Sequence, residues 1–450
     1  MNRMNRRQLL KTLGAGAGMM ALAACAPVGA PGAAPSAASG GTAPAAAPIA
    51  VTLWSSFSGV LGEQEQALVD RFKAEYAGEV ELDYQFQGSY EDTAQKVTAA
   101  LQARTAPDIS LLSDVWWFKF YLNETLVPLD DLMAAEGVDP SDYQDPLINE
   151  GYRQGLHWWL PFARSTPLFY YNKEKWAEAG LPDRGPDTWM EFMEWAPELV
   201  KMEGDTMTTS AFAHPDGASY IAWLFQGVAW QFGGKYSDPD FTMHMTNDDT
   251  IRAGQFYHDT VHTYKWAVPS KDLTTDFVNG FTAAAMMSTG SMGGVRRGAQ
   301  FEFGTAFLPK ETYFGCCTGG AGLAILTSCP EEKRPAAFKY LAFASNTEQA
   351  ALWAQGTGYM PVRKSSLQSE SMQAYFAENP QFETAAKQLE FTRPQDAARV
   401  FVPNGDQIIG KGLERITVQS EDVATVFAEV QATLEREAQP VIEALRAVEG

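Results

Sequence analysis

Hydrophobic and polar positions along most of the chain switch between two periods. Three short apolar stretches bounded by turn residues, VTLWSSF, VELDYQF and PDISLLSD (residues 51–57, 80–86 and 107–114), predict strands. The segments between them, residues 63–76 and 90–101, place apolar side chains every three or four residues and predict helices. Alternating strands and helices indicate βαβ units and a mostly parallel sheet.

Ligands of such sheets bind beyond the carboxyl ends of the strands. Asp114 closes the third predicted strand, and a Ser/Gly-rich turn over residues 55–59 follows the first one. Both positions are therefore candidate ligand contacts.

A long extended stretch, LPFARSTPLFYYN (residues 160–172), is polar in its middle and apolar on both sides. A buried hydroxyl must be hydrogen-bonded internally or face a bound molecule, which makes Ser165 a second candidate contact. The local alternative is a hydrogen bond within a turn. Helices are predicted around Trp189, over residues 220–234 and at the end of the chain, and we find no internal repeat.

The first fifty residues differ in composition from the rest. NRRQLLK, with its paired arginines, precedes an apolar stretch that ends in LAAC at Cys25. We interpret residues 1–24 as a twin-arginine-like signal peptide that ends in a lipobox, and Cys25 as lipidated. The alternative is an ordinary signal peptide followed by an incidental cysteine. Residues 25–49 carry no charge and hardly any bulky side chain, which predicts a flexible linker. We expect an extracytoplasmic protein held to the cell membrane only by this lipid.

Charge narrows the set of partners. The formal net charge is −21, and removal of the four basic residues before Cys25 would leave −25. Such a surface argues against nucleic acid or an anionic membrane face as a ligand. A small anion remains compatible with it if the site concentrates a few cations.

Cysteine and histidine positions do not indicate a metal. Cys329 would pair with Cys316 or Cys317 in a disulfide, or all three thiols are buried as small apolar groups. His258 and His262 stand four residues apart, as two ligands on one helix face would, but no third ligand accompanies them. We interpret them as part of a polar helix face.

Motifs of catalysis are also missing. There is no Walker loop after Cys25, and STGSMGG fails the G-x-S-x-G pattern because Thr289 stands at its first glycine. The many Asp and Glu residues leave a hydrolase with a carboxylate pair possible, although nothing in the sequence positions one.

Six motifs along the chain resemble those of one family. They are APDI (106–109), YYNKEKWAEAGL (170–181), PDTWMEF (186–192), FVNGFTAAAM (277–286), GGAGLAIL (319–326) and TGYMPV (357–362). In this order they resemble the extracellular solute-binding proteins of bacterial ABC importers, the family that includes maltose-binding protein. Within it, SSFSGVLGE, GSYED, FARSTPLFYYNK, STGS and GTGYMP look most like the binders of sn-glycerol 3-phosphate and glycerophosphodiesters.

The resemblance implies a fold and a function. The fold is α/β and two-lobed, each lobe a mostly parallel sheet flanked by helices, with a ligand cleft between the lobes. We place residues 50–165 and 303–345 in the first lobe, and 166–302 and 346–450 in the second. A monomer that delivers a polyol phosphate to the transmembrane subunits of a permease is implied, without catalytic residues, cofactor or metal.

The same resemblance implies a set of solute contacts. Tyr90 and Tyr359 would supply phenols, Ser165 and Ser288 hydroxyls, and Gly320 a backbone N–H. Arg399 would hold the phosphate, Asp114 would accept from glycerol hydroxyls, and Trp189 would pack against the rest of the solute. Two positions depart from the family: Asp114 stands in place of Glu, and Arg164 in place of a small polar residue. Arg164 would either add phosphate affinity or pair with a surface acid.

Two other functions compete with this interpretation. A binder of neutral oligosaccharides would use tryptophans as stacking platforms, with Trp54, Trp189, Trp223 and Trp230 as candidates. An extracellular hydrolase would require two carboxylates about 5–10 Å apart across a cleft.

Overall fold

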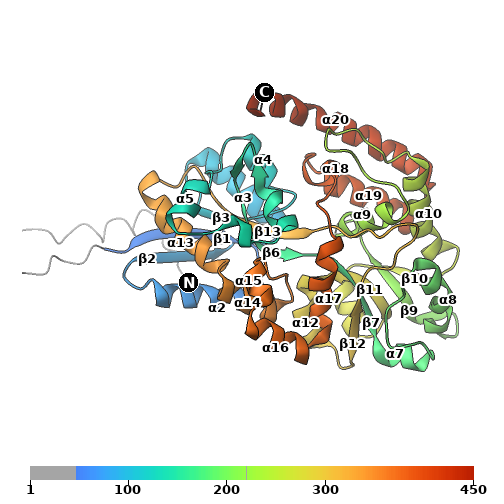
Figure 1. Ribbon diagram of the computed structural model, residues 1–450. Helices are drawn as coiled ribbons and strands as arrows, with labels where there is room; N and C mark the ends of the chain where they lie inside the picture. Colours follow the sequence, from blue (N-terminus) through green and yellow to red (C-terminus); the bar gives the residue numbers. More distant parts are fainter. Residues whose placement is uncertain (1–46, 219, 450) are drawn as a thin grey trace, which may run out of the picture. The chain divides into compact units, whose positions relative to one another are not determined.

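A computed structural model describes residues 47–449 of the chain, apart from residue 219. The described residues contain two large sheets, one of five strands and one of six, and each is surrounded by helices (Figure 1). We refer to each sheet with its helices as a lobe. None of the described helices combines the length and the apolar character that crossing a membrane requires. The predicted signal peptide and most of the linker, including Cys25, lie outside the described residues.

The first sheet has the strand order β2-β1-β3-β13-β6. Its strands are β1 (Ile49–Ser55), β2 (Val80–Phe86), β3 (Ile109–Ser113), β6 (Leu160–Ser165) and β13 (Gly319–Ile325). Its helices are α2 (Gly59–Glu75), α3 (Tyr90–Ala103), α4 (Trp117–Leu122), α5 (Asp130–Ala135), α6 (Asp145–Ile148), α13 (Arg334–Ala344) and α14 (Thr347–Thr357). A small hairpin of β4 (Tyr152–Arg153) and β5 (Leu156–His157) stands apart from this sheet.

The second sheet has the order β10-β9-β11-β7-β12, with β8 paired to β9 off this path. Its strands are β7 (Pro167–Asn172), β8 (Lys201–Glu203), β9 (Thr206–Pro215), β10 (Ala267–Ser270), β11 (Thr282–Ser288) and β12 (Phe303–Ala306). Its helices are α7 (Lys173–Glu178), α8 (Trp189–Leu199), α9 (Ile221–Gln231), α10 (Asp248–His262), α11 (Leu273–Val278), α12 (Met292–Gly298), α18 (Ala397–Val400), α19 (Gly405–Thr417) and α20 (Val423–Glu449).

Both sheets are mostly parallel, as predicted. In the first sheet, β13 alone runs against its neighbours β3 and β6. Along the main path of the second, β7 alone runs against β11 and β12. These two antiparallel strands lie next to the points where the chain passes between the lobes.

The chain passes between the sheets through residues 160–172. The first half of this stretch is β6 of the first sheet, the second half is β7 of the second sheet, and Thr166 joins them. All residues of both strands are buried, so alternate side chains serve opposite faces. Leu168 and Tyr170 enter one hydrophobic core, while Phe169 and Tyr171 enter another, and each core contains residues of both lobes.

The predicted lobe boundaries need two corrections in the second half of the chain. Residues 303–306 are placed in the first lobe by the sequence, but they form β12 and pair with β7 of the second sheet. Helix α14, predicted in the second lobe, packs on α2 of the first. The path then returns through α15 (Lys364–Gln368), α16 (Glu370–Glu378) and α17 (Pro380–Gln388), which contacts β12.

The long helix α20 connects the lobes by a different route. It packs on α10 and α19 of the second lobe, and its last turns reach α4 of the first (Figure 1). There the Glu449 carboxylate accepts hydrogen bonds from Tyr121 (2.9 Å) and from Arg153 (2.7 and 2.9 Å).

The described cysteines are not cross-linked. Cys316, Cys317 and Cys329 are buried free thiols, which agrees with the second of the two predicted alternatives. His258 and His262 lie on α10. The His258 side chain is hydrogen-bonded to the Ser420 hydroxyl, and the His262 side chain is hydrogen-bonded to the Ile416 carbonyl. Among the described residues, no three His, Cys, Asp or Glu side chains are grouped as a metal would require.

Candidate functional site

A cavity of about 520 Å³ lies where the two lobes meet, a volume typical of small-molecule sites. We call it the solute cavity. Seven of the eight solute contacts implied by the family resemblance line it: Tyr90, Asp114, Ser165, Ser288, Gly320, Tyr359 and Arg399. They are spread along the chain from α3 to α18, so the fold assembles the group.

Strand ends place several of these side chains. Asp114 directly follows β3, Ser165 is the last residue of β6, and Ser288 is the last residue of β11. The carboxyl ends of strands from both sheets therefore face this cavity, where ligands of open α/β sheets bind. Tyr90 is placed by α3, because the Ser89 side chain caps the helix directly before it.

Trp189 is the exception, and its predicted role is wrong. It is the first residue of α8, but its side chain is 2% exposed and packs among Phe192, Phe212 and Phe256 in the core of the second lobe. Its indole N–H donates to Gln231 Oε1 at 2.7 Å. The apolar face of α8 covers β9, and Trp189 belongs to that face rather than to the cavity.

The hydroxyl groups in the cavity have few internal partners. The Tyr90 hydroxyl is buried and makes no hydrogen bond within the described residues, and Ser165 is 3% exposed. An unpaired buried hydroxyl is costly, which indicates that this position is completed by a bound molecule or water. Burial, followed by the nearby Tyr359, raises the pKa of Tyr90 well above its usual value, so the phenol remains a donor.

Two glycines allow close approaches at this site. Gly320 has φ +105°, and a Cβ there would collide with the carbonyl oxygen of Ala163. Its own carbonyl accepts from the Asp114 N–H at 2.9 Å, which fixes the turn after β3. A Cβ on Gly290 would lie 2.7 Å from the Tyr359 ring, so glycine lets that ring reach the cavity.

Arg399 lies in the cavity wall between two carboxylates. Its side chain is 7% exposed; Nε lies 2.6 Å from Asp406 Oδ1, and Nη1 lies 3.6 Å from Asp114 Oδ2. Nη1 also donates to Gln395 Oε1. Nε and Nη1 thus face internal groups, and Nη2 has no hydrogen-bond partner within the described residues, so Nη2 is the nitrogen left to bind an anion.

The two carboxylates change the charge balance around Arg399. Burial lowers the pKa of Arg399, but the charges of Asp406 and Asp114 more than offset this effect. The pKa is therefore raised, and the guanidinium stays protonated. Burial raises the pKa of Asp406, and Arg399 only partly opposes the effect. Asp406, in the first turn of α19, is a site residue that the sequence interpretation missed.

Aromatic side chains form the remaining wall. Trp116, Tyr220 and Trp223 line the cavity, and the Trp223 indole donates to the Thr318 carbonyl at 2.9 Å. Of the four tryptophans proposed for a sugar site, only Trp223 is among the residues lining this cavity. Trp116 was missed, although its place two residues after Asp114 at a strand end was a usable signal.

Arg164 does not line the cavity. Its guanidinium is fully buried and pairs with Glu150, so the acid that it meets is an interior one rather than a surface one.

Two lobes joined by crossing strands, with side chains from both lining one cavity, are the architecture expected of a solute-binding protein. The family described as bacterial extracellular solute-binding protein matches residues 67–384, and the chain belongs to it. Members of this family bind solutes and are not enzymes, which sets aside the hydrolase alternative.

Particular relatives narrow the class further. The chain is 26% identical over 363 residues to the sn-glycerol-3-phosphate-binding periplasmic protein UgpB of Escherichia coli K12, covering 75% of this chain and 80% of the relative. It is 42% identical to UgpB from Mycobacterium tuberculosis, whose crystal structure is in complex with glycerophosphocholine. That match has a TM-score of 0.83 and covers 88% of this chain and 100% of the other. The GacH receptor of Streptomyces glaucescens, at 18% identity with a TM-score of 0.75 and coverage of 87% and 98%, shares the fold.

Proposed function

We propose that this protein captures sn-glycerol 3-phosphate or a glycerophosphodiester in the solute cavity and delivers it to an ABC permease. The observation that carries the proposal is the Arg399 guanidinium in the cavity wall, with Nη2 open to a ligand among the described residues. The charged N–H groups of Nη2 can donate to phosphate oxygens. A neutral sugar has no need of such a group.

The rest of the cavity suits a glycerol moiety. Ser165, Ser288, Tyr90 and Tyr359 offer hydroxyl groups, and the Asp114 carboxylate accepts hydrogen bonds. The aromatic wall residues Trp223 and Tyr220 offer apolar faces against which a glycerol carbon chain or an alcohol substituent can pack.

The negative charge of the protein opposes the binding of a phosphate. The chain has a net charge of −21, and two carboxylates flank Arg399, so the surroundings repel an anion. Phosphate binding therefore depends on local donors. This supports a site that is selective for a ligand with both a phosphate and several hydroxyls, since neither group alone engages all of the donors.

Calorimetric titration with four ligands tests the proposal. We expect sn-glycerol 3-phosphate and glycerophosphocholine to bind and to raise the melting temperature, and glycerol and maltose not to do so at the same concentrations. Binding of maltose without binding of either phosphate would overturn the proposal and favour the oligosaccharide alternative, in which the three aromatic residues of the wall stack on sugar rings.

We further propose that Cys25 is lipidated and anchors the protein outside the cytoplasm, with residues 25–49 as a tether to the folded part. Cleavage before Cys25 and acylation of its thiol are supported by the LAAC sequence and by the featureless segment that follows it. The fold begins with β1 at Ile49, where this tether would end.

Fractionation of cells tests the anchor. Cys25→Ser should move the protein from the membrane to the soluble fraction and leave ligand binding unchanged. A Cys25→Ser protein that stays with the membrane after salt washing would contradict the lipid anchor without affecting the proposed solute.

A further inference from the structure

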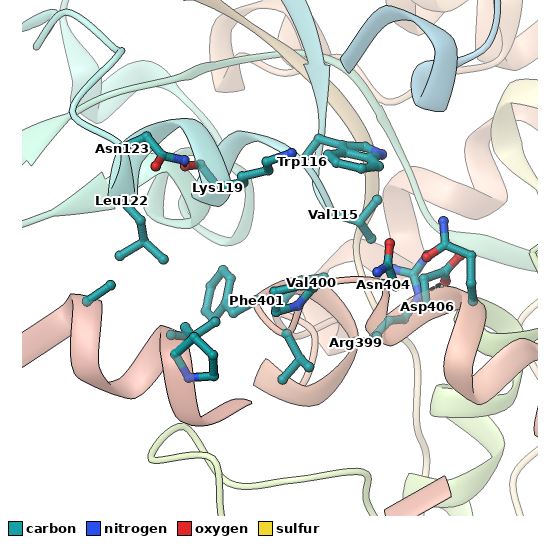
Figure 2. Close-up of a pocket in the computed structure, with 17 residues that line it drawn as sticks. Val115, Trp116, Lys119, Leu122, Asn123, Arg399, Val400, Phe401, Asn404 and Asp406 are labelled. Atoms are coloured by element: carbon teal, nitrogen blue, oxygen red, sulfur yellow. Dashed lines mark hydrogen bonds and ion pairs between the residues drawn. The ribbon is translucent and has the colours of Figure 1, made fainter. Parts of the chain in front are cut away.

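A second cavity, of about 350 Å³, shares lining residues with the solute cavity, and Figure 2 draws the residues that line it. We call it the side chamber. Its walls come from α4, from the segment between α18 and α19, and from α20, so both lobes contribute to it. Figure 2 shows Leu122 and Phe401 pointing into the space from opposite sides.

The two cavities share a common wall. Val115, Trp116, Arg399, Asp406 and Gln407 line both of them. Arg399 is therefore reached from the solute cavity and also borders the side chamber. A group bound to this guanidinium would lie beside the wall that the two spaces share.

Both spaces have mostly apolar walls, and they differ in the polar groups that accompany them. The solute cavity contains two serine hydroxyls and two phenols of the implied contacts. The side chamber is bounded mainly by apolar side chains, including Leu122, Val402 and Val441. Of its polar residues, Lys119, Asn123 and Asn404 are exposed, and Arg399, Asp406 and Gln407 belong to the wall shared with the solute cavity. Such a space favours alkyl groups, because burying them removes apolar surface from water.

A phosphodiester has two ester arms that leave the phosphorus in different directions. We propose that the side chamber receives the second arm of a glycerophosphodiester, and that this arm is an apolar alcohol. This inference rests on the proposed function, since it places the phosphate at Arg399 and the glycerol arm in the solute cavity. The chamber would make the protein a receptor for alkyl glycerophosphodiesters and not only for small polar ones.

The arrangement predicts a dependence on chain length. Each CH₂ group that enters the chamber should tighten binding by up to about fourfold. Affinity should therefore rise from sn-glycerol 3-phosphate ethyl ester to the butyl and hexyl esters, and level off once the chamber is full.

Calorimetry with this ester series and three variants tests the inference. Ala444→Phe on α20 fills the chamber, and Ala444→Leu fills it partly, which covers the case that the larger side chain disturbs folding. Ala447→Phe is the matched control, because Ala447 is exposed on the same helix and does not line the chamber. We expect Ala444→Phe to abolish the gain of the hexyl ester, Ala444→Leu to reduce it, and all three variants to bind sn-glycerol 3-phosphate within about twofold of the unaltered protein.

The outcomes separate the two proposals. If sn-glycerol 3-phosphate binds but the esters show no gain with length, or the gain survives in both Ala444 variants, the side chamber has no part in binding and this inference is wrong. If neither sn-glycerol 3-phosphate nor any ester binds to the unaltered protein, the proposed function itself fails and this inference falls with it.

Discussion

Two buried arginines show how differently the same residue is used in this protein. Arg399 lies in the cavity wall, between Asp114 and Asp406. Arg164 lies behind the cavity, where it pairs with Glu150 and stacks on Trp159 with 4.8 Å between the guanidinium carbon and the ring centre. Both side chains are at least nine-tenths buried, but only Arg399 lines a space that a ligand can enter.

Burial and charge alone therefore do not identify a ligand contact. Glu150 accepts from Arg164 and from the Thr318 hydroxyl, so its carboxylate has internal partners, while Nε and Nη1 of Arg164 have no hydrogen-bond partner among the described residues. Burial nevertheless raises the pKa of Glu150, and Arg164 only partly opposes the effect. Buried groups away from the solute cavity, such as Arg164 and Glu150, should affect folding stability, and groups in the cavity wall should affect ligand affinity.

The greatest change is expected at Arg164. Arg164→Met would leave the buried Glu150 carboxylate without its cation, which typically costs about 3–5 kcal/mol of stability. Urea unfolding should show a lowered midpoint, and Arg164→Met combined with Glu150→Gln should recover part of the loss. An unchanged midpoint in Arg164→Met would remove the distinction between the two arginines.

Glu65 is another buried group away from the solute cavity. Its carboxylate oxygens lie 2.7 and 2.8 Å from the Ser55 hydroxyl, and one of them accepts a hydrogen bond from Tyr84 at 2.8 Å. Burial raises its pKa from the usual 4.5 to about 7. Between these pH values the folded protein holds a proton that the unfolded chain has lost, so stability falls as the pH rises through this window. The whole difference corresponds to about 3 kcal/mol.

Unfolding measured from about pH 4.5 to 8 tests this prediction. Glu65→Gln should remove most of the decline in this window and stabilise the protein at the alkaline end. Glu63→Gln is the control on the same helix, because exposed Glu63 pairs with Arg297 at the surface and its pKa is lowered by that hydrogen bond. An equal pH dependence in Glu65→Gln and the unaltered protein would contradict the buried, protonated state.

At Arg399 we expect the effect in affinity. Hydrogen bonds to charged groups are worth about 1.5–3 kcal/mol, so Arg399→Ala should weaken sn-glycerol 3-phosphate binding by at least about tenfold in a calorimetric titration. Arg399→Lys should recover only part, because an ammonium group does not reproduce the planar guanidinium that lies between Asp406 and Gln395. If Arg399→Ala keeps full affinity, the phosphate is bound elsewhere.

A smaller change is expected at Asp114, also in the cavity wall. Asp114→Asn weakens the hydrogen-bond acceptor, because an amide oxygen is neutral, and it removes a negative charge that repels phosphate. These opposing changes should leave the affinity for sn-glycerol 3-phosphate within about fivefold, or about 1 kcal/mol. A loss as large as that of Arg399→Ala would mean that Asp114 holds the solute by a bond that needs its charge.

Much of the fold and most of the candidate site could be predicted from the sequence. The period of the apolar residues identified β1, α2, β2, α3 and β3, and the motif resemblance placed Ser165 and Arg399 at one cavity. It could not place Trp189, because an aromatic residue at a helix start has the same pattern whether it faces a core or a cavity. The sequence of a strand also does not show which strand it pairs with. For this reason residues 303–306 are predicted in the first lobe, although they pair with β7 of the second sheet.

The residues that were missed have a common physical reason. Asp406 reaches the cavity through the packing of α19, and Trp116 through the turn after β3, and neither belongs to a motif that the resemblance rests on. The interior partner of Arg164 is likewise set by tertiary structure, since Glu150 precedes the β4–β5 hairpin and meets Arg164 only after the chain has folded back.

The contact between Glu449 and the first lobe offers a way to observe motion. Most of α20 packs on the second lobe, while Glu449 at its end is hydrogen-bonded to Arg153 and Tyr121 near the first lobe. The last turns of the helix therefore link the two lobes. We expect an opening of the lobes to release that end. Amide hydrogens of the final turns should then exchange with solvent faster while the rest of α20 stays protected, so hydrogen–deuterium exchange at this one helix end would report the open state directly.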